Sequence, residues 1–139
     1  MSIFVGIDFG ESRIGVAISD EQKKIAFPLG VLHREKGSYG LKSLKRLLDD
    51  RDADRFVVGL PVRSDGTVGT QGEKVLLYID ALHDYFNRDV VTWDERYTTV
   101  IASNVLREGS TGSKKGRKVV DKIAAQIILQ SYLDHSNST

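Results

Sequence analysis

The order of extended and helical segments along the chain constrains the fold more than any other feature of the sequence. Three extended segments, 3–8, 13–19 and 25–32, follow one another with only short polar turns between them, so we expect an antiparallel meander. Two later strands, 55–60 and 89–93, alternate with segments of helical periodicity. Strands joined by helical crossovers run parallel. The sequence therefore predicts an α/β fold with a mixed five-stranded central sheet flanked by helices, in the order βββαβαβαα.

Local signals refine this outline in the first two thirds of the chain. Pro28 lies within the third extended segment, which predicts an edge strand or a bulge because proline cannot donate to a sheet ladder. Thr70 and Glu73 have the spacing of a capping box. They predict the start of a helix that carries Val75 and Leu82 on its apolar stripe.

The last third of the chain is predicted to be helical with one loop. Thr98 or Thr99 is expected to cap a helix that runs through Leu106, and the Gly-, Ser- and Lys-rich segment 109–116 is expected to be a loop. A final helix is predicted from about Lys118 to Leu133. The polar residues 135–139 are expected to form a flexible tail, which leaves a single domain over 1–134.

Composition excludes several classes of protein. The 139 residues contain no cysteine, so disulfides, thiolate nucleophiles and cysteine zinc sites are ruled out. No apolar run approaches the roughly 20 residues of a membrane span, and the amino terminus lacks the pattern of a signal peptide. We therefore expect a cytoplasmic protein without a membrane partner.

The charge distribution predicts a local site for any polyanionic partner. Lys and Arg number 20 and Asp and Glu 19, so the net charge is only +1. Between Arg107 and Lys122, however, six basic residues stand against two acidic ones. This segment is interpreted as a mobile basic flap over a nucleic-acid backbone, or alternatively as a solvated loop. The expected contacts are Lys114, Lys115, Arg117 and Lys118.

Two carboxylates are expected where strands end. Asp8 closes the most apolar strand, where a charge must be neutralised by a metal, a cation or hydrogen bonds; the alternative is that it caps a tight turn. Glu95 follows the fifth strand, at the edge where open α/β sheets place their sites, although a solvated turn explains it equally well. The neighbouring Arg96 is expected either to contact phosphate or to hold Glu95.

A third carboxylate occupies the apolar face of the last helix. Helical spacing places Asp121 on one face with Ala124, Ala125, Ile128 and Tyr132. An acid on the face that meets a sheet is costly unless something positive meets it; the alternative is an exposed acid in the first helical turn. If this helix crosses the first strand, Asp121 arrives beside Asp8.

Three carboxylates that converge need cations between them. Hard oxygen ligands favour Mg²⁺ or Mn²⁺, and a site of this kind commonly holds two ions and hydrolyses a phosphodiester. The sequence therefore predicts a metal site of Asp8, Glu95 and Asp121, with two bound ions.

Four ordered motifs that cover nearly the whole chain resemble the YqgF family. They are Gly6-Ile7-Asp8-Phe9-Gly10 with Arg13-Ile14-Gly15-Val16-Ala17, Val57-Val58-Gly59-Leu60-Pro61 with Asp65-Gly66-Thr67, Asp94-Glu95-Arg96-Tyr97-Thr98-Thr99, and Val120-Asp121-Lys122-Ile123-Ala124-Ala125 with Ile128 to Leu133. The resemblance implies a ribonuclease H-like, Holliday-junction-resolvase-like fold. It also implies a nuclease that processes the 5′ end of pre-16S rRNA in ribosome biogenesis, with Asp8, Glu95 and Asp121 as the acidic triad.

The sequence departs from the family's relatives at two positions. Crossover-junction resolvases of this fold carry a further acid three residues after the last one, where this chain has Ala124, which weakens the junction-cutting interpretation. Val68 stands where many relatives have an acid, which puts the role of that loop in doubt.

Alternative functions remain open at this level. They are a Holliday-junction resolvase acting on structured DNA, a nucleic-acid-binding ribosome-assembly factor with little catalysis, and a phosphate-binding ATPase, for which 139 residues supply no second lobe. No apolar helical face is left over for an obvious dimer, so we expect a monomer with at most weak dimerisation.

Overall fold

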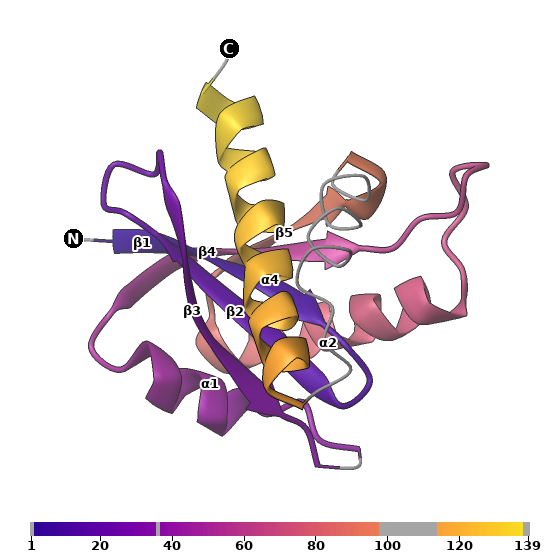
Figure 1. Cartoon of the computed structure of the whole chain (residues 1–139), viewed down its shortest axis with the longest axis horizontal. Helices are drawn as coiled ribbons and strands as arrows, with labels where there is room; N and C mark the ends of the chain where they lie inside the picture. The colour runs from indigo at the N-terminus through magenta and orange to yellow at the C-terminus, as the bar shows by residue number, and fades with distance from the viewer. Residues whose placement is uncertain (1, 36, 98–113, 138–139) are drawn as a thin grey trace.

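The computed structural model describes residues 2–35, 37–97 and 114–137; within 114–120 it describes the backbone only. Its centre is a five-stranded sheet in the order β3-β2-β1-β4-β5 (Figure 1). The strands are β1 (Ser2–Phe9), β2 (Arg13–Ser19), β3 (Ala26–His33), β4 (Asp52–Leu60) and β5 (Asp89–Asp94). β1 to β3 pair antiparallel, and β4 pairs parallel with β1 and with β5. The predicted mixed sheet is therefore confirmed.

Helices cover both faces of this sheet. They are α1 (Leu41–Leu48), α2 (Thr70–Phe86) and α4 (Lys114–Asn137), and the short 3₁₀ helix η1 (Glu95–Tyr97) follows β5. α4 runs across the face that is nearer the viewer in Figure 1, and α1 and α2 lie behind the sheet. The helix predicted from Thr98 or Thr99 to Leu106 lies outside the described residues.

Alternation along β1 builds the core on the side of α1 and α2. Ile3, Val5 and Ile7 point to this face, because successive strand residues alternate sides. They pack with apolar residues of both helices, among which Leu44 and Leu82 are fully buried. This cluster anchors the strand that ends in Asp8.

The opposite face of β1 is shaped for close contact with α4. A Cβ atom at Gly6 would lie 2.6 Å from Cβ of Leu129, so only glycine allows the helix to approach this far. Ala17, Val57 and Ala125 complete this second core with small side chains. Asp8 lies two residues beyond Gly6 and therefore faces α4 as well.

β3 is an edge strand, as Pro28 predicted. Pro28 pairs with Ala17, and the register between β2 and β3 shifts between Val16 and Ala17. The proline therefore lies next to an irregularity at the edge of the sheet, where its missing donor costs least.

The capping box predicted for α2 is wrong. Gly69 is the N-cap, with an extended backbone and no side-chain cap, and Thr70 is the first helical residue. The reason is that the N–H of Glu73 donates to the carbonyl of Gly69 at 2.9 Å, which moves the cap one residue upstream. A Cβ at Gly69 would lie 2.9 Å from Nε of Arg63, so the arginine packs where a capping side chain would stand.

α4 is longer than the predicted helix of 118–133. It begins at Lys114, so residues 114–116, predicted as part of a loop, are helical, and it ends at Asn137, inside the predicted tail. Its last turns are held by hydrogen bonds that the polar composition of this segment does not reveal. Gln130 Nε2 donates to the carbonyl of Lys24 at 2.9 Å, and Asn137 Nδ2 donates to the carbonyl of Lys23 at 2.9 Å.

Candidate functional site

Asp8 lies on β1 between two strands that carry glycine beside it. Its Cα partner on β2 is Gly15. On the other side, the register Ile7↔Val58 places Gly59 of β4 alongside Asp8. Neither neighbour has a side chain, so the face of the sheet around this carboxylate is open to groups from α4 and from the end of β5.

The glycine on β2 admits the first turns of α4. A Cβ at Gly15 would overlap the backbone oxygen of Asp121 and lie 3.5 Å from Cβ of Ala125. The helix backbone therefore rests directly on β2, and Asp121 lies on the side of the helix that meets the sheet. α4 does cross β1, since Gly6 meets Leu129 and Ala125, and the charge of Asp121 acts on Asp8.

The glycine on β4 admits Glu95. A Cβ at Gly59 would lie 2.7 Å from Oε1 of Glu95, so the carboxylate is folded back over the strand. Glu95 begins η1 directly after β5, whose residue Trp93 is the Cα partner of Gly59. Glu95 is therefore turned toward the sheet rather than toward solvent, in contrast to the alternative of a solvated turn.

Electrostatics connects the three acids through Asp8. Burial, followed by the charge of Asp121, raises the pKa of the Asp8 carboxyl to about 6. Burial, followed by the charges of Asp8 and Asp94, raises the pKa of Glu95 to about 7. Each of these carboxyls is therefore costly to ionise at neutral pH, and a bound cation would relieve that cost.

Arg13 is a member of this site that the sequence analysis missed. It opens β2, and its Nε donates to Oδ2 of Asp121 at 2.5 Å. It supplies the positive charge that Asp121 needed on its sheet-facing side. Strand alternation could have found it, because Arg13 shares a face with Gly15 and with Ala17, which packs in the core under α4.

The chemistry of the three acids suits a divalent cation, but their arrangement in this structure suits it less well. All three offer hard oxygen donors, and their mutual repulsion through Asp8 is the kind that Mg²⁺ or Mn²⁺ relieves. Among the residues that the structure describes, however, no group of three His, Asp or Glu side chains is gathered closely enough to hold an ion. Full convergence therefore requires a side chain to move, and Asp121 already pairs with Arg13.

Arg96 does not hold Glu95, which corrects one of the two expectations for it. Its guanidinium makes hydrogen bonds of 2.6–3.1 Å to the carboxylate of Asp94, and Nη1 donates to the carbonyl of Arg63 at 3.5 Å. Asp94 is the last residue of β5, and both the backbone N–H and the guanidinium of Arg96 turn back to its carboxylate. This pairing lowers the pKa of Asp94 and leaves the phosphate role of Arg96 as a prediction.

The basic residues expected to contact nucleic acid lie on α4. Lys114, Lys115, Arg117 and Lys118 all belong to the first turns of this helix, so the expected loop is helical here. Their side chains lie outside the described part of the structure. The helix nonetheless carries them about one to two turns ahead of Asp121, at the same edge of the sheet as the acids.

Trp93 belongs to the core, and Tyr97 is exposed. The Trp93 ring packs 5.3 Å from Tyr97 and 6.0 Å from Tyr132 between centroids, and it joins the cluster beneath α4. Tyr97 is 66% exposed next to Glu95. A base could stack on Tyr97 without disturbing the core.

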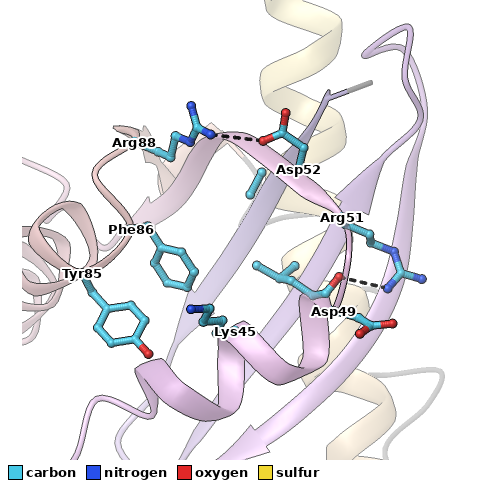
Figure 2. Close-up of a pocket in the computed structure, with 9 residues that line it drawn as sticks. Lys45, Asp49, Arg51, Asp52, Tyr85, Phe86 and Arg88 are labelled. Carbon is cyan, nitrogen blue, oxygen red and sulfur yellow. Dashed lines mark hydrogen bonds and ion pairs between the residues drawn. The ribbon is translucent and has the colours of Figure 1, made fainter.

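A separate hollow lies at the far end of the sheet, where β4 begins. Figure 2 shows Lys45 of α1, Asp49 directly after α1, Arg51 and Asp52 before and at the start of β4, and Arg88 after α2. The cavity measures about 270 Å³. Its charges are partly satisfied within the wall, since Arg88 pairs with Asp52 at 3.4 Å. None of the predicted site residues lines it.

The part of the chain that the structure describes contains no helix long and apolar enough to cross a membrane.

Curated relatives match nearly the full length of the chain. A protein of Desulforudis audaxviator named "Putative pre-16S rRNA nuclease" is 42% identical over 134 residues, which cover 96% of this chain and 95% of that protein. A protein of the same name from Clostridium botulinum (strain Hall) is 40% identical over 130 residues, covering 94% of this chain and 95% of its own.

Solved structures share the fold at low sequence identity. RuvC of T. thermophilus in complex with a Holliday junction substrate has a TM-score of 0.57 at 12% identity, covering 100% of this chain and 98% of that one. Fowlpox virus resolvase in complex with Holliday junction DNA has a TM-score of 0.55 at 15% identity, covering 96% and 98%. These likenesses confirm the ribonuclease H-like fold.

The model of the RuvX family, described as Holliday junction resolvase, matches residues 2–135. This match and the curated relatives confirm the resemblance found in the four sequence motifs. The chain therefore belongs to the RuvX (YqgF) family, a family of nucleases that hydrolyse phosphodiester bonds.

Proposed function

We propose that the protein is a metal-dependent nuclease that processes the 5′ end of pre-16S rRNA in the cytoplasm during ribosome biogenesis. The observation that carries this proposal is the position of Asp8, which lies half-buried at the edge where the parallel strands end and is repelled by Asp121. Asp8 in turn acts on Glu95. The RNA substrate is suggested by the names of the curated relatives.

Asp8, Glu95 and Asp121 would hold Mg²⁺ or Mn²⁺, with two ions as the expected number. Bound ions of this kind activate the attacking water and stabilise the departing oxygen of the phosphodiester. The chain's own residues supply the negative site and its placement. Gly15 and Gly59 leave the face beside Asp8 clear, so that α4 and η1 bring their acids to the same edge.

The basic turn of α4 would contact the nucleic-acid backbone. Four basic residues precede Asp121 on the same helix: Lys114, Lys115, Arg117 and Lys118. Positive charge next to the acids would keep the phosphates of the nucleic-acid strand at the site. Arg96 is a fifth candidate for this contact, and its pairing with Asp94 fixes the direction of its guanidinium.

The direct test is cleavage of labelled pre-16S rRNA by the purified protein with Mg²⁺, with Mn²⁺ or with chelator. The proposal expects cleavage that either ion supports and that chelator abolishes. Asp121→Asn should lose cleavage and keep RNA binding. The matched control is Asp134→Asn on the exposed part of the same helix, which should cleave like the wild type. RNA binding without cleavage in the wild type would instead indicate an assembly factor.

Holliday-junction resolution is the second candidate, favoured by the description of the family model. Symmetric cutting of a four-way junction needs two active sites related by a two-fold axis. We expect a monomer, and Ala124 stands where junction resolvases of this fold carry a further acid. A labelled four-way junction in the same assay, together with sedimentation at micromolar concentration, separates the candidates. A stable dimer that cuts junctions symmetrically would favour resolution.

A further inference from the structure

The ion pair between Arg13 and Asp121 joins the first residue of β2 to the sheet-facing side of α4. Nε of Arg13 lies 2.5 Å from Oδ2 of Asp121, and the two side chains are only 27% and 21% exposed. A charge-assisted hydrogen bond with so little solvent around it is stronger than a pair on the open surface. It joins one of the three predicted metal ligands to a cation on another element of the fold.

The backbone on both sides of this pair is fixed. The N–H of Gly10 donates to the carbonyl of Arg13 at 2.9 Å, and Arg13 pairs with His33 across the sheet. On the other side, the backbone of Asp121 rests on Gly15. A rearrangement of this ion pair therefore has to come from the side chains of Arg13 and Asp121, which can rotate about their own bonds without a change of fold.

The carboxylate of Asp121 interacts both with Arg13 and with Asp8. It lies close enough to Asp8 to act on it electrostatically, yet the described acids are not gathered into a group that could hold an ion. An ion shared by Asp8 and Asp121 needs the Asp121 oxygens turned toward Asp8. Turning the carboxylate so that both oxygens face Asp8 would take Oδ2 away from the guanidinium of Arg13.

We propose that Arg13 competes with the divalent ion for Asp121, so that binding of the ion displaces the guanidinium. This inference rests on the proposed function, because it takes Asp121 to be a metal ligand. Arg13 is then a positioning residue that holds the acid in place and neutralises it until an ion arrives. Its removal should strengthen ion binding, whereas the removal of a residue that orients a metal ligand weakens it.

The test measures ion binding directly, without substrate, by calorimetric titration of the full chain with Mg²⁺ and with Mn²⁺. Arg13→Gln should bind either ion about tenfold more tightly than the wild type, because the ion no longer has to break a charged hydrogen bond. Arg13→Lys keeps a cation without the planar guanidinium and should fall between the two. Arg88→Gln breaks a pair with Asp52 at the far end of the sheet and should bind like the wild type.

Thermal unfolding supplies a second readout. Without metal, Arg13→Gln should melt below the wild type, because Asp121 loses its partner beside Asp8. The rise in Tm on addition of ion should be larger for this variant than for the wild type. A purely structural role of Arg13 would lower both melting temperatures and leave the rise unchanged.

The outcomes separate this inference from the proposed function. If the wild type binds neither ion, the metal site itself is wrong and the inference falls with it. If the wild type binds and Arg13→Gln binds equally or less tightly, only the competition is overturned. If Arg13→Gln does not fold, Arg13→Lys decides: binding at or below the wild-type affinity overturns the competition, and tighter binding supports it.

Discussion

Asp8 occupies a position in which its ionised carboxylate destabilises the folded state. Burial and a nearby acid raise the pKa of its carboxyl from 3.8 to about 6. The folded state therefore binds a proton that the unfolded state has already lost between these pH values, and the stability of the fold decreases as the pH rises through this window. Residues under such strain are common at functional sites.

Asp8→Asn should therefore stabilise the protein in chelator. A shift of this size corresponds to about 2–3 kcal/mol at pH 7.5. The gain should shrink as the pH falls through this window and approach zero only well below pH 3.8, where Asp8 is protonated in both states. Urea unfolding followed by Trp93 fluorescence at several pH values measures it. The same variant should lose cleavage, because an amide is a poor ligand for two ions.

Asp20→Asn is the control for the sign of this effect. Asp20 accepts the N–H groups of Ile25 and Lys24, at 2.9 and 2.8 Å, and its pKa is lowered by these bonds. Its stabilising effect is present above its unfolded pKa and is lost as the pH falls. Substitution should therefore destabilise the protein at pH 7.5. A uniform response of both variants to pH would contradict the electrostatic account of Asp8.

Sequence reasoning found the acids of the site but not their partners. Asp8, Glu95 and Asp121 stood out because each contradicted its local apolar or strand-end context. Arg13 contacts an acid 108 positions away. Strand alternation places Arg13 on the face that α4 covers, but it does not indicate which acid is its partner. Arg96 had two acidic neighbours, and only the geometry of η1 shows that it takes Asp94.

At the scale of elements, glycines on three strands determine where α4 lies. Gly6 meets Leu129, Gly15 meets the backbone of Asp121, and Gly59 meets Ile128 and the side chain of Glu95. Because all lie on the face that α4 covers, the helix can approach the sheet more closely than side chains would allow. The separation between Asp121 and Asp8 therefore depends on residues that carry no chemistry of their own.

Gly15→Ala should push the first turns of α4 away from β2. The added methyl would overlap the backbone oxygen of Asp121, which cannot give way as a flexible side chain does. Overpacking of this kind costs about 1–3 kcal/mol, and we expect weaker Mg²⁺ binding in addition, because Asp121 moves away from Asp8. Urea unfolding and calorimetric titration measure the two effects.

Gly30→Ala is the matched control for the substitution at Gly15. Its added Cβ would meet only the tip of Leu47, at 3.3 Å, on the edge strand β3. This flexible tip can move aside, so stability and ion binding should stay close to wild type. If both variants lose ion binding equally, the close approach of α4 to β2 at Gly15 does not determine ion binding at the site.

The sequence predicted the order and pairing of the strands more accurately than the ends of the helices. Connection length determines pairing, because a turn of a few residues allows only an antiparallel neighbour. Helix ends depend on contacts made elsewhere in the chain. α4 continues to Asn137 because its side chain reaches the carbonyl of Lys23. α2 begins at Thr70 with Gly69 as its N-cap, where Arg63 packs in place of a capping side chain.

At the scale of the whole molecule, the near balance of charge means that a nucleic-acid interface has to be local. With a net charge of +1, the protein as a whole attracts a polyanion only weakly. α1 and α4 both carry lysine and arginine, but they cover opposite faces of the sheet. Of these two helices, α4 is the one whose basic turn lies at the edge that carries the three acids, so position rather than total charge should determine binding.

Replacement of Lys114, Lys115, Arg117 and Lys118 by glutamine should weaken binding of single-stranded RNA and flatten its salt dependence. If all four contact phosphates, the slope of log K against log salt should become shallower by up to about 3. Replacement of the exposed Lys42, Lys45, Arg46 and Arg51, on and after α1, produces the same net charge on the far face. That control should bind with nearly the wild-type slope. Fluorescence anisotropy over a salt series measures both, in chelator so that the RNA stays intact. Equal losses in the two variants would mean that net charge, and not the turn beside the acids, attracts the strand.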